Sequence, residues 1–190
     1  IGDDNLSEFN LHVIDLLSNL SKSTEVYFLA GNRDFMIGKK FLAMTGCKKI
    51  SDITSINIYG KNILLTHGDL LLTKDRKYQR SRKIWQNKIT KNLFMLLPLN
   101  VRINFGNSVR EKSKQDAKIR DESTFDVDIG LVKSIIKKHK TDIFIYGHIH
   151  KTSVSYHEKS IVISLPDWND NNGSSLVISS DGYVGLENNW

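Results

Sequence analysis

Three short polar motifs hold most of the residues that could carry out chemistry. They are Gly31-Asn-Arg-Asp34, His67-Gly-Asp69 and Gly147-His-Ile-His150. Neutral imidazole and carbonyl oxygen are good ligands for divalent transition metals. The pattern therefore predicts a metal site built from four side chains, those of Asn32, His67, His148 and His150.

Each motif taken alone has a plainer interpretation. His67 could be a structural histidine, and Asn32 could be a turn residue that tolerates a positive φ. Arg33 could pair with Asp34, or its guanidinium could hold a phosphate beside the metal through two parallel hydrogen bonds. The two histidines of residues 147–150, directly after an apolar run, are the strongest single indication of metal binding.

Each motif follows a short apolar run that we predict to be a buried strand. The runs cover residues 25–30, 62–66 and 142–146, and the second pairs with residues 55–59 in a predicted hairpin. In open α/β sheets, binding sites form just beyond the carboxyl ends of the strands. We therefore expect the three motifs to converge at one edge of a sheet.

Apolar side chains at helical spacing predict helices around these strands. The helix over residues 6–20 should bury one face, and others are expected over 35–44 and 127–136. Further strands are predicted near the C-terminus, at residues 153–156, 161–165 and 176–179. This order of elements indicates an α/β fold that ends in antiparallel strands.

A basic segment separates the second and third motifs, and we predict two or three helices within it. From Lys74 to Arg120 there are 14 basic and 3 acidic residues, a net charge of +11, whereas the whole chain carries +6. Seven apolar residues in a row, Leu93–Leu99, lie in the middle. Solvated helix faces would explain the charge, and a short buried helix would explain the apolar run. Together they fit an amphipathic ligand or an anionic membrane surface.

The composition excludes several other classes of protein. With 39% hydrophobic and 25% charged residues among 190, the chain is globular rather than disordered. The single cysteine, Cys47, rules out a disulfide within the chain. No apolar run approaches the roughly 20 residues of a membrane span. The length suits one domain over residues 1–190.

The three motifs, in this order, resemble the second half of the calcineurin-like metallophosphoesterase pattern. The closer resemblance is to the UDP-2,3-diacylglucosamine hydrolase family. It rests additionally on Ile1-Gly-Asp-Asp4, Phe35, Gly38-Lys39, Ser113, Arg120 and Phe125-Asp-Val127. The resemblance implies a four-layer α/β/β/α sandwich with a helical cap inserted at about residues 74–124.

The resemblance also implies a reaction and its residues. Water activated by two Mn²⁺ ions would attack the α-phosphorus of UDP-2,3-diacylglucosamine and give UMP and 2,3-diacylglucosamine 1-phosphate, a step of lipid A biosynthesis. Asn32, His67 and His148 would bind one ion, and His150 would bind the other. The implied catalytic residues are His148 and Arg33. The implied substrate contacts are Asn32, Arg33, Asp75, Ser113, Arg120 and His148.

The chain departs from the family pattern in three respects. Arg120 stands where the family commonly has Lys, which keeps the charge, and Ala117 stands where it commonly has Asn, which removes a hydrogen-bonding group. The family also opens with an Asp-x-His motif and a Gly-Asp motif, which would precede Ile1. We therefore expect that a first βα unit is lacking, and that these 190 residues alone bind metal poorly and do not turn over.

Two other functions stay open from the residues alone. The basic segment permits a metallophosphoesterase that acts on nucleotides or nucleic acid, although the Leu93–Leu99 run argues against a nucleic-acid groove. An inactive phosphoesterase-like module that binds an anion or a membrane is the other. The lipid hydrolase would lie in the cytoplasm, bound peripherally to the inner face of a Gram-negative inner membrane.

Overall fold

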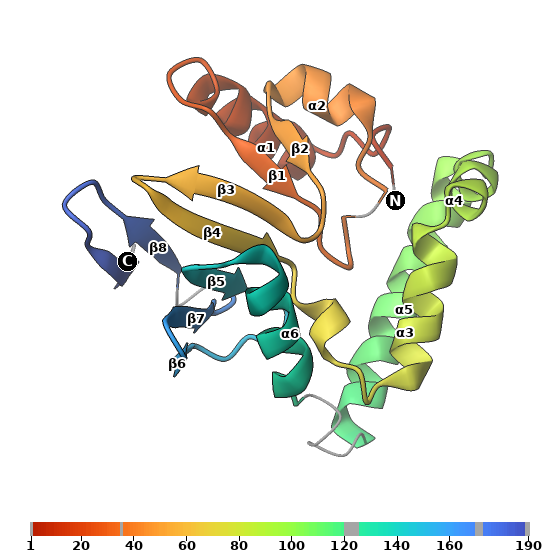
Figure 1. The fold of residues 1–190 in the computed structure, drawn as a ribbon. Coiled ribbons are helices and arrows are strands. Elements are labelled where there is room, and N and C mark those ends of the chain that lie inside the picture. The colour runs from red at the N-terminus through yellow and green to blue at the C-terminus, as the bar shows by residue number, and fades with distance from the viewer. Residues whose placement is uncertain (1, 35, 120–125, 170–172, 189–190) are drawn as a thin grey trace. The chain divides into compact units, whose positions relative to one another are not determined.

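The computed structural model describes residues 2–34, 36–119, 126–169 and 173–188. The chain forms two compact units (Figure 1). Unit 1 comprises residues 1–51 and 75–124, and unit 2 comprises residues 52–74 and 125–190. The second segment of unit 1 contains the predicted cap at about 74–124. The cap and a single domain over the whole chain both stay predictions.

Unit 2 is built on a five-stranded mixed sheet in the order β3-β4-β5-β7-β6. The three central strands are parallel, and the two edge strands pair antiparallel with their neighbours. The predicted hairpin and the strands that follow it are confirmed. Their bounds are β3 (Thr54–Ile58), β4 (Lys61–Thr66), β5 (Ile143–Tyr146), β6 (Ser153–His157) and β7 (Ser160–Ser164).

The sheet of unit 2 has a hydrophobic cluster on each face because successive side chains of a strand point to opposite sides. On β5, Phe144 and Tyr146 pack with Val132 of helix α6 (Ile129–His139). Ile143 and Ile145 join the other cluster, which the hairpin of β8 (Ser174–Ile178) and β9 (Val184–Asn188) covers. Unit 2 therefore has three layers, with the central strand β5 fixed by burial on both faces.

The amino-terminal end of α6 is capped by Asp128. Its side chain accepts hydrogen bonds from the Leu131 backbone N–H at 3.0 Å and from the Thr73 hydroxyl at 2.8 Å. These two bonds, the Leu131 bond foremost, lower the pKa of Asp128. Because the folded-state pKa lies below the unfolded value of about 3.9, the cap stabilises the fold above that pH. Its contribution is lost as the pH falls through the folded-state pKa.

We therefore expect Asp128→Ala to lower the melting temperature at pH 7, and expect the difference from the unsubstituted chain to shrink towards pH 3. Thermal unfolding followed by circular dichroism at both pH values measures this. Asp126→Ala is the matched control, because exposed Asp126 makes a 3.5 Å ion pair with Lys74 and such surface pairs contribute little. A deficit for Asp128→Ala that is the same at both pH values would contradict the expectation.

The first segment of unit 1 contains a two-stranded parallel sheet of β1 (Tyr27–Leu29) and β2 (Lys48–Ile50). Helix α2 (Lys39–Thr45) connects them and ends at Gly46, whose φ of 72° gives the left-handed cap that glycine favours. The predicted strand and helix are confirmed at these places. Strand β2 was not predicted, because its exposed lysines show no alternation.

Helix α1 (Glu8–Leu20) does not have the buried face that its apolar spacing predicts. No residue of α1 is buried, and Phe9 is 73% exposed. Val13, Ile14 and Leu17 form only a half-buried strip, and the helix packs against α2. The prediction was wrong because amphipathic spacing shows which face is apolar, not how much of it a neighbour covers.

The second segment of unit 1 forms three helices, as predicted: α3 (Arg76–Gln86), α4 (Lys88–Met95) and α5 (Leu99–Ile119). The rings of Trp85, Phe94 and Phe105 hold them together, with centroids 5.3 to 5.4 Å apart. The remaining apolar residues of the 93–99 run are largely solvent-accessible, and Leu96 is 80% exposed. The alternative of a short buried helix is therefore wrong. None of the helices described combines the length and apolarity needed to cross a bilayer.

Candidate functional site

Two of the predicted site residues meet where β4 and β5 end. These strands are parallel neighbours in which Thr66 pairs with Tyr146, so the chain leaves both at the same level. The Gly147 N–H donates to the His67 carbonyl at 3.1 Å and continues the ladder by one step. The His148 Nδ1 and His67 Nε2 atoms then lie 3.1 Å apart, with the rings nearly perpendicular.

The backbone just after β4 and β5 has positive φ angles, which glycine adopts readily and other residues adopt rarely. Gly68 has a φ of 102°, and a Cβ there would lie 2.7 Å from the Gly147 carbonyl oxygen. Glycine is therefore required for the two loops to approach. His148 and His150 have φ values of 73° and 56°, a left-handed conformation that is uncommon outside glycine and clusters at functional sites.

Asp52 holds the backbone of the His67 loop. One carboxylate oxygen, Oδ1, accepts hydrogen bonds from the Thr66 hydroxyl at 2.6 Å and from the His67 N–H at 3.0 Å. The next residue, Ile53, has a φ of 59°, a strained value for a β-branched residue. Sequence reasoning missed Asp52, since no local pattern shows that its carboxylate reaches a loop 15 residues away.

We expect Asp52→Ala to lower kcat/KM of the intact gene product about 10- to 100-fold, the usual effect of removing a group that orients a metal ligand. The affinity for Mn²⁺, measured by calorimetry, should fall in parallel. Asp52→Asn keeps an acceptor oxygen and should retain most of both. Equal losses for the Ala and Asn variants would show that Asp52 does not act by holding the loop.

His150 lies against Asp167 rather than in the histidine pair. Its Nδ1 is 3.5 Å from an oxygen of the Asp167 carboxylate, and the His150 side chain is 64% exposed. A carboxylate at one ring nitrogen is the usual partner of a histidine that binds metal through the other. The geometry is compatible with the predicted ligand role of His150, which stays a prediction.

The other predicted site residues belong to unit 1. Asn32, half-buried, and Arg33, exposed, follow β1 in a turn that the Asp34 N–H closes on the Gly31 carbonyl at 3.2 Å. Because the histidines belong to unit 2, the convergence of all three motifs stays a prediction.

Three predicted substrate contacts are in the cap segment. Asp75 is buried, and its side chain caps α3 by accepting from the Tyr78 N–H at 2.9 Å. Ser113 is exposed on α5. Arg120 lies outside the described residues, as does the side chain of Ala117.

The His67–His148 pair fits a divalent cation as two of its ligands. With metal–nitrogen bonds of about 2.1 Å, two nitrogens on one ion lie roughly 3.0–3.4 Å apart, and these two lie 3.1 Å apart. In the part of the chain that the structure describes, no set of three or more His, Cys, Asp or Glu side chains is arranged to hold a metal. The pair therefore accounts for part of a coordination shell.

A mixed α/β fold with paired histidines at adjoining strand ends is consistent with a metal-dependent phosphoesterase. The chain matches the model of the calcineurin-like phosphoesterase family over residues 1–152 and therefore belongs to that family. It is 35% identical to the UDP-2,3-diacylglucosamine hydrolase of Haemophilus influenzae over 187 residues, which are 98% of this chain and 79% of the relative.

Two further proteins are similar to this chain. The UDP-2,3-diacylglucosamine hydrolase of Neisseria meningitidis is 34% identical over 185 residues, which are 97% of this chain and 77% of the relative. Among solved structures, an archaeal phosphodiesterase shares 15% identity and a TM-score of 0.48, over 97% of this chain and 78% of that one.

The family match confirms three sequence-based predictions: the resemblance to metallophosphoesterases, the mixed α/β class and the assignment as a hydrolase. Membership implies that a divalent metal is used. The identity and number of the ions, the role of each residue and the location in the cell stay predictions.

Proposed function

We propose that this protein hydrolyses the pyrophosphate bond of UDP-2,3-diacylglucosamine to UMP and 2,3-diacylglucosamine 1-phosphate, in lipid A biosynthesis. The observation that carries the proposal is identity of 34 to 35% over nearly the whole chain to hydrolases named for that substrate. The imidazole pair at the ends of β4 and β5 supports it, because its spacing suits a shared divalent ion.

The residues of the chain have distinct parts in the proposed reaction. Bound divalent ions, two Mn²⁺ in this proposal, supply an activated water and neutralise charge on the phosphate. Asn32, His67 and His148 would hold one ion, and His150 would hold the other. Arg33 binds phosphate oxygens through two parallel hydrogen bonds. The sugar and phosphates also contact the cap residues Asp75, Ser113 and Arg120.

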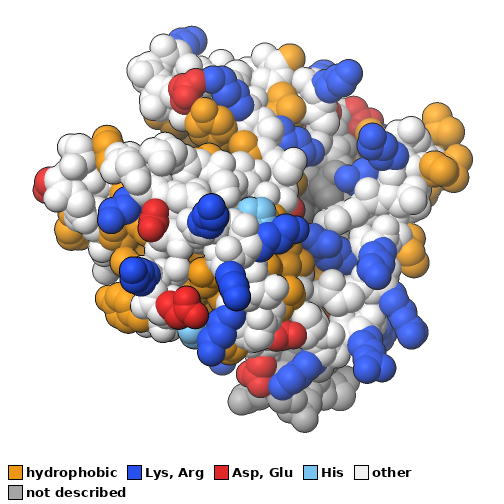
Figure 2. Space-filling view, viewed as in Figure 1, with side chains coloured by type: hydrophobic (Ala, Val, Ile, Leu, Met, Phe, Trp, Pro, Cys, Tyr) orange, Lys and Arg blue, Asp and Glu red, His pale blue; other side chains and the backbone are white. Residues whose placement is uncertain are grey.

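An exposed apolar patch on the cap favours an acylated substrate over a nucleic acid. Leu93 and Leu96 of the α4 end are 62% and 80% exposed, and Val101 and Phe105 of α5 are also exposed, at 49% and 41%. Hydrophobic side chains gather at the α4 end in Figure 2, while Lys and Arg line α3 and α5. An apolar patch bordered by cations suits acyl chains next to anionic groups.

The test is release of UMP from UDP-2,3-diacylglucosamine by the intact gene product. We expect release with Mn²⁺, loss of release with EDTA, and recovery when Mn²⁺ is restored. Release that is insensitive to EDTA would contradict the metal-dependent reaction. Hydrolysis of nucleotides or single-stranded nucleic acid, without release of UMP from this substrate, would instead favour a metallophosphoesterase that acts on nucleotides or nucleic acid.

The same proposal places the protein in the cytoplasm, bound peripherally to the inner face of the inner membrane. The net charge of +11 between Lys74 and Arg120 supports it, since clustered basic residues are attracted to anionic lipid surfaces. Cell fractionation tests it, with recovery in the membrane pellet and release by a high-salt wash as the supporting result. Recovery in the soluble fraction at low salt would contradict it.

A further inference from the structure

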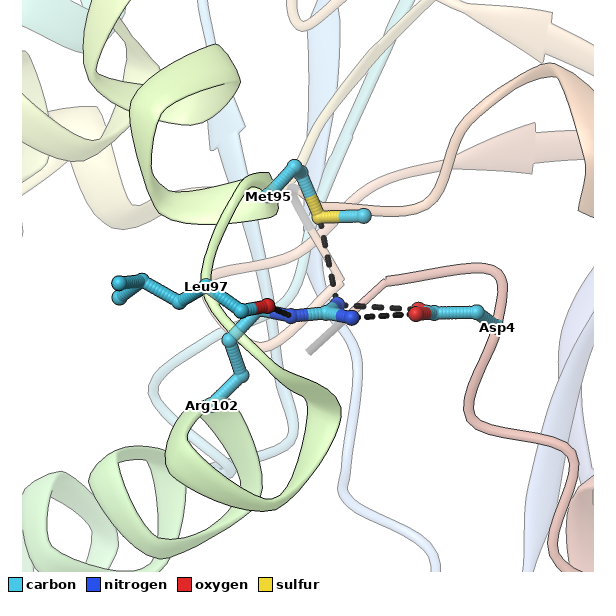
Figure 3. Close-up of polar contacts among 4 residues, drawn as sticks. All are labelled: Asp4, Met95, Leu97 and Arg102. Carbon is cyan, nitrogen blue, oxygen red and sulfur yellow. Dashed lines mark hydrogen bonds and ion pairs between the residues drawn. The ribbon is translucent and has the colours of Figure 1, made fainter.

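The Arg102 guanidinium is buried in unit 1 and held by several acceptors (Figure 3). Its side chain is only 3% exposed. Nε donates to the Leu97 carbonyl at 2.9 Å, and Nη1 donates to Asp4 Oδ1 at 2.9 Å. Nη2 forms an ion pair with the other oxygen of Asp4. A guanidinium bound through two nitrogens to one carboxylate is fixed in orientation as well as position.

Asp4 is the group that balances this buried charge. The hydrogen bond from Arg102 lowers the pKa of the Asp4 carboxyl, so the pair stays ionised at neutral pH. Removing one partner of such a pair leaves a buried charge uncompensated. The pair joins residues 98 positions apart in the chain, so it fixes the start of α5 to the amino-terminal segment.

The neighbouring carboxylate, Asp3, holds a different helix. Its two oxygens accept hydrogen bonds from the Gly38 N–H at 2.7 Å and the Lys40 N–H at 3.0 Å. Gly38 precedes the first turn of α2 and has no side chain to cap it. Asp3 therefore acts as the cap of α2 from 35 residues away, where a carboxylate is favoured by the helix dipole.

Two adjacent carboxylates thus tie α2 to α5. We infer that Asp3, which binds the start of α2, and Asp4, which binds Arg102 of α5, form a clamp that positions the substrate-binding residues of unit 1. Helix α2 follows the loop of Asn32 and Arg33, whereas α5 carries Ser113 and leads to Arg120. Arg102 and Asp4 are positioning residues, and their effect on turnover rests on the proposed function.

The kinetic test compares KM with kcat for UDP-2,3-diacylglucosamine in variants of the intact gene product. Asp4→Asn should raise KM on the order of tenfold or more, because displaced binding groups lose contacts, and at saturating Mn²⁺ should lower kcat by a clearly smaller factor. Asp4→Glu keeps the carboxylate and should restore KM. Glu25→Gln is the matched control, since Glu25 and Lys48 form an ion pair that is well exposed in the same unit. An unchanged KM in Asp4→Asn, or an equal fall in kcat, would overturn the inference.

A second measurement does not depend on activity. Hydrogen–deuterium exchange in the 190-residue chain should be faster in both α2 and α5 of Asp4→Asn, and unchanged in α6 of unit 2 and in Glu25→Gln. If Asp4→Asn also loses protection in α6, the milder Arg102→Lys variant is measured instead. Lysine keeps the positive charge but cannot bind the Asp4 carboxylate through two nitrogens. Unchanged exchange in α5 would overturn the clamp. If the unsubstituted protein does not hydrolyse the substrate while exchange is still faster in Asp4→Asn, the proposed function is refuted but the clamp is not.

Discussion

Replacing His148 by Ala should lower kcat/KM of the intact gene product for UDP-2,3-diacylglucosamine on the order of 10³-fold, because metal stabilisation contributes several kcal/mol and each 1.36 kcal/mol is a factor of ten. His148 Nδ1 lies 3.1 Å from His67 Nε2, so its loss removes one of the two nitrogens brought together at the strand ends. Steady-state release of UMP, at saturating and subsaturating Mn²⁺, measures the effect.

The control for this variant is His157→Ala. His157 belongs to β6 and pairs with Ser160 at the start of β7, so it lies at the opposite end of the strands from the histidine pair. Its replacement should leave kcat/KM within about twofold. If His148→Ala retains its activity, or if both variants lose it equally, the histidine pair is not the site of metal-dependent chemistry.

The double substitution Leu93→Ser with Leu96→Ser should raise KM for the acylated substrate on the order of 10²-fold, because burying a leucine side chain contributes about 1.5–3 kcal/mol. Both leucines are exposed on the cap, so their replacement should not disturb folding. The deacylated UDP-sugar should bind equally well to both proteins. Initial rates with the two substrates separate loss of acyl contacts from general damage.

Leu16→Ser provides the matched control for these leucines. Leu16 is 55% exposed on α1, in the same unit as the cap, and has no part in the proposed acyl contacts. We expect its KM for both substrates to be unchanged. A parallel rise in KM for acylated and deacylated substrate in the Leu93/Leu96 variant would contradict an acyl-binding cap.

The pairing of His67 with His148 was predictable because several local signals agree. The runs at 62–66 and 142–146 are mostly apolar on successive residues, as buried parallel strands are, and each is followed directly by a motif that combines glycine with histidine. The parallel pairing of β4 with β5, which the structure shows, places the two motifs at the same edge and brings these two side chains together.

The residues that hold the site and the cap were not predictable in the same way. Asp52 supports the His67 loop, and Asp4 pairs with Arg102, through side-chain bonds between distant positions. Asp52 and Asp4 are single acidic residues in irregular segments. Hydrophobic periodicity carries no information about which residues their side chains bind. The resemblance did include residues 1–4 among the family features, but it did not reveal that they cap α2 and bind α5.

The most direct test of the proposed reaction is hydrolysis of UDP-2,3-diacylglucosamine by the intact gene product in ¹⁸O-labelled water, with the products analysed by mass spectrometry. Attack of water on the α-phosphorus forms the new P–O bond in UMP and releases the bridging oxygen with the lipid phosphate. We therefore predict one ¹⁸O atom in UMP and none in 2,3-diacylglucosamine 1-phosphate. Label in the lipid product, or no formation of UMP, would contradict the proposal.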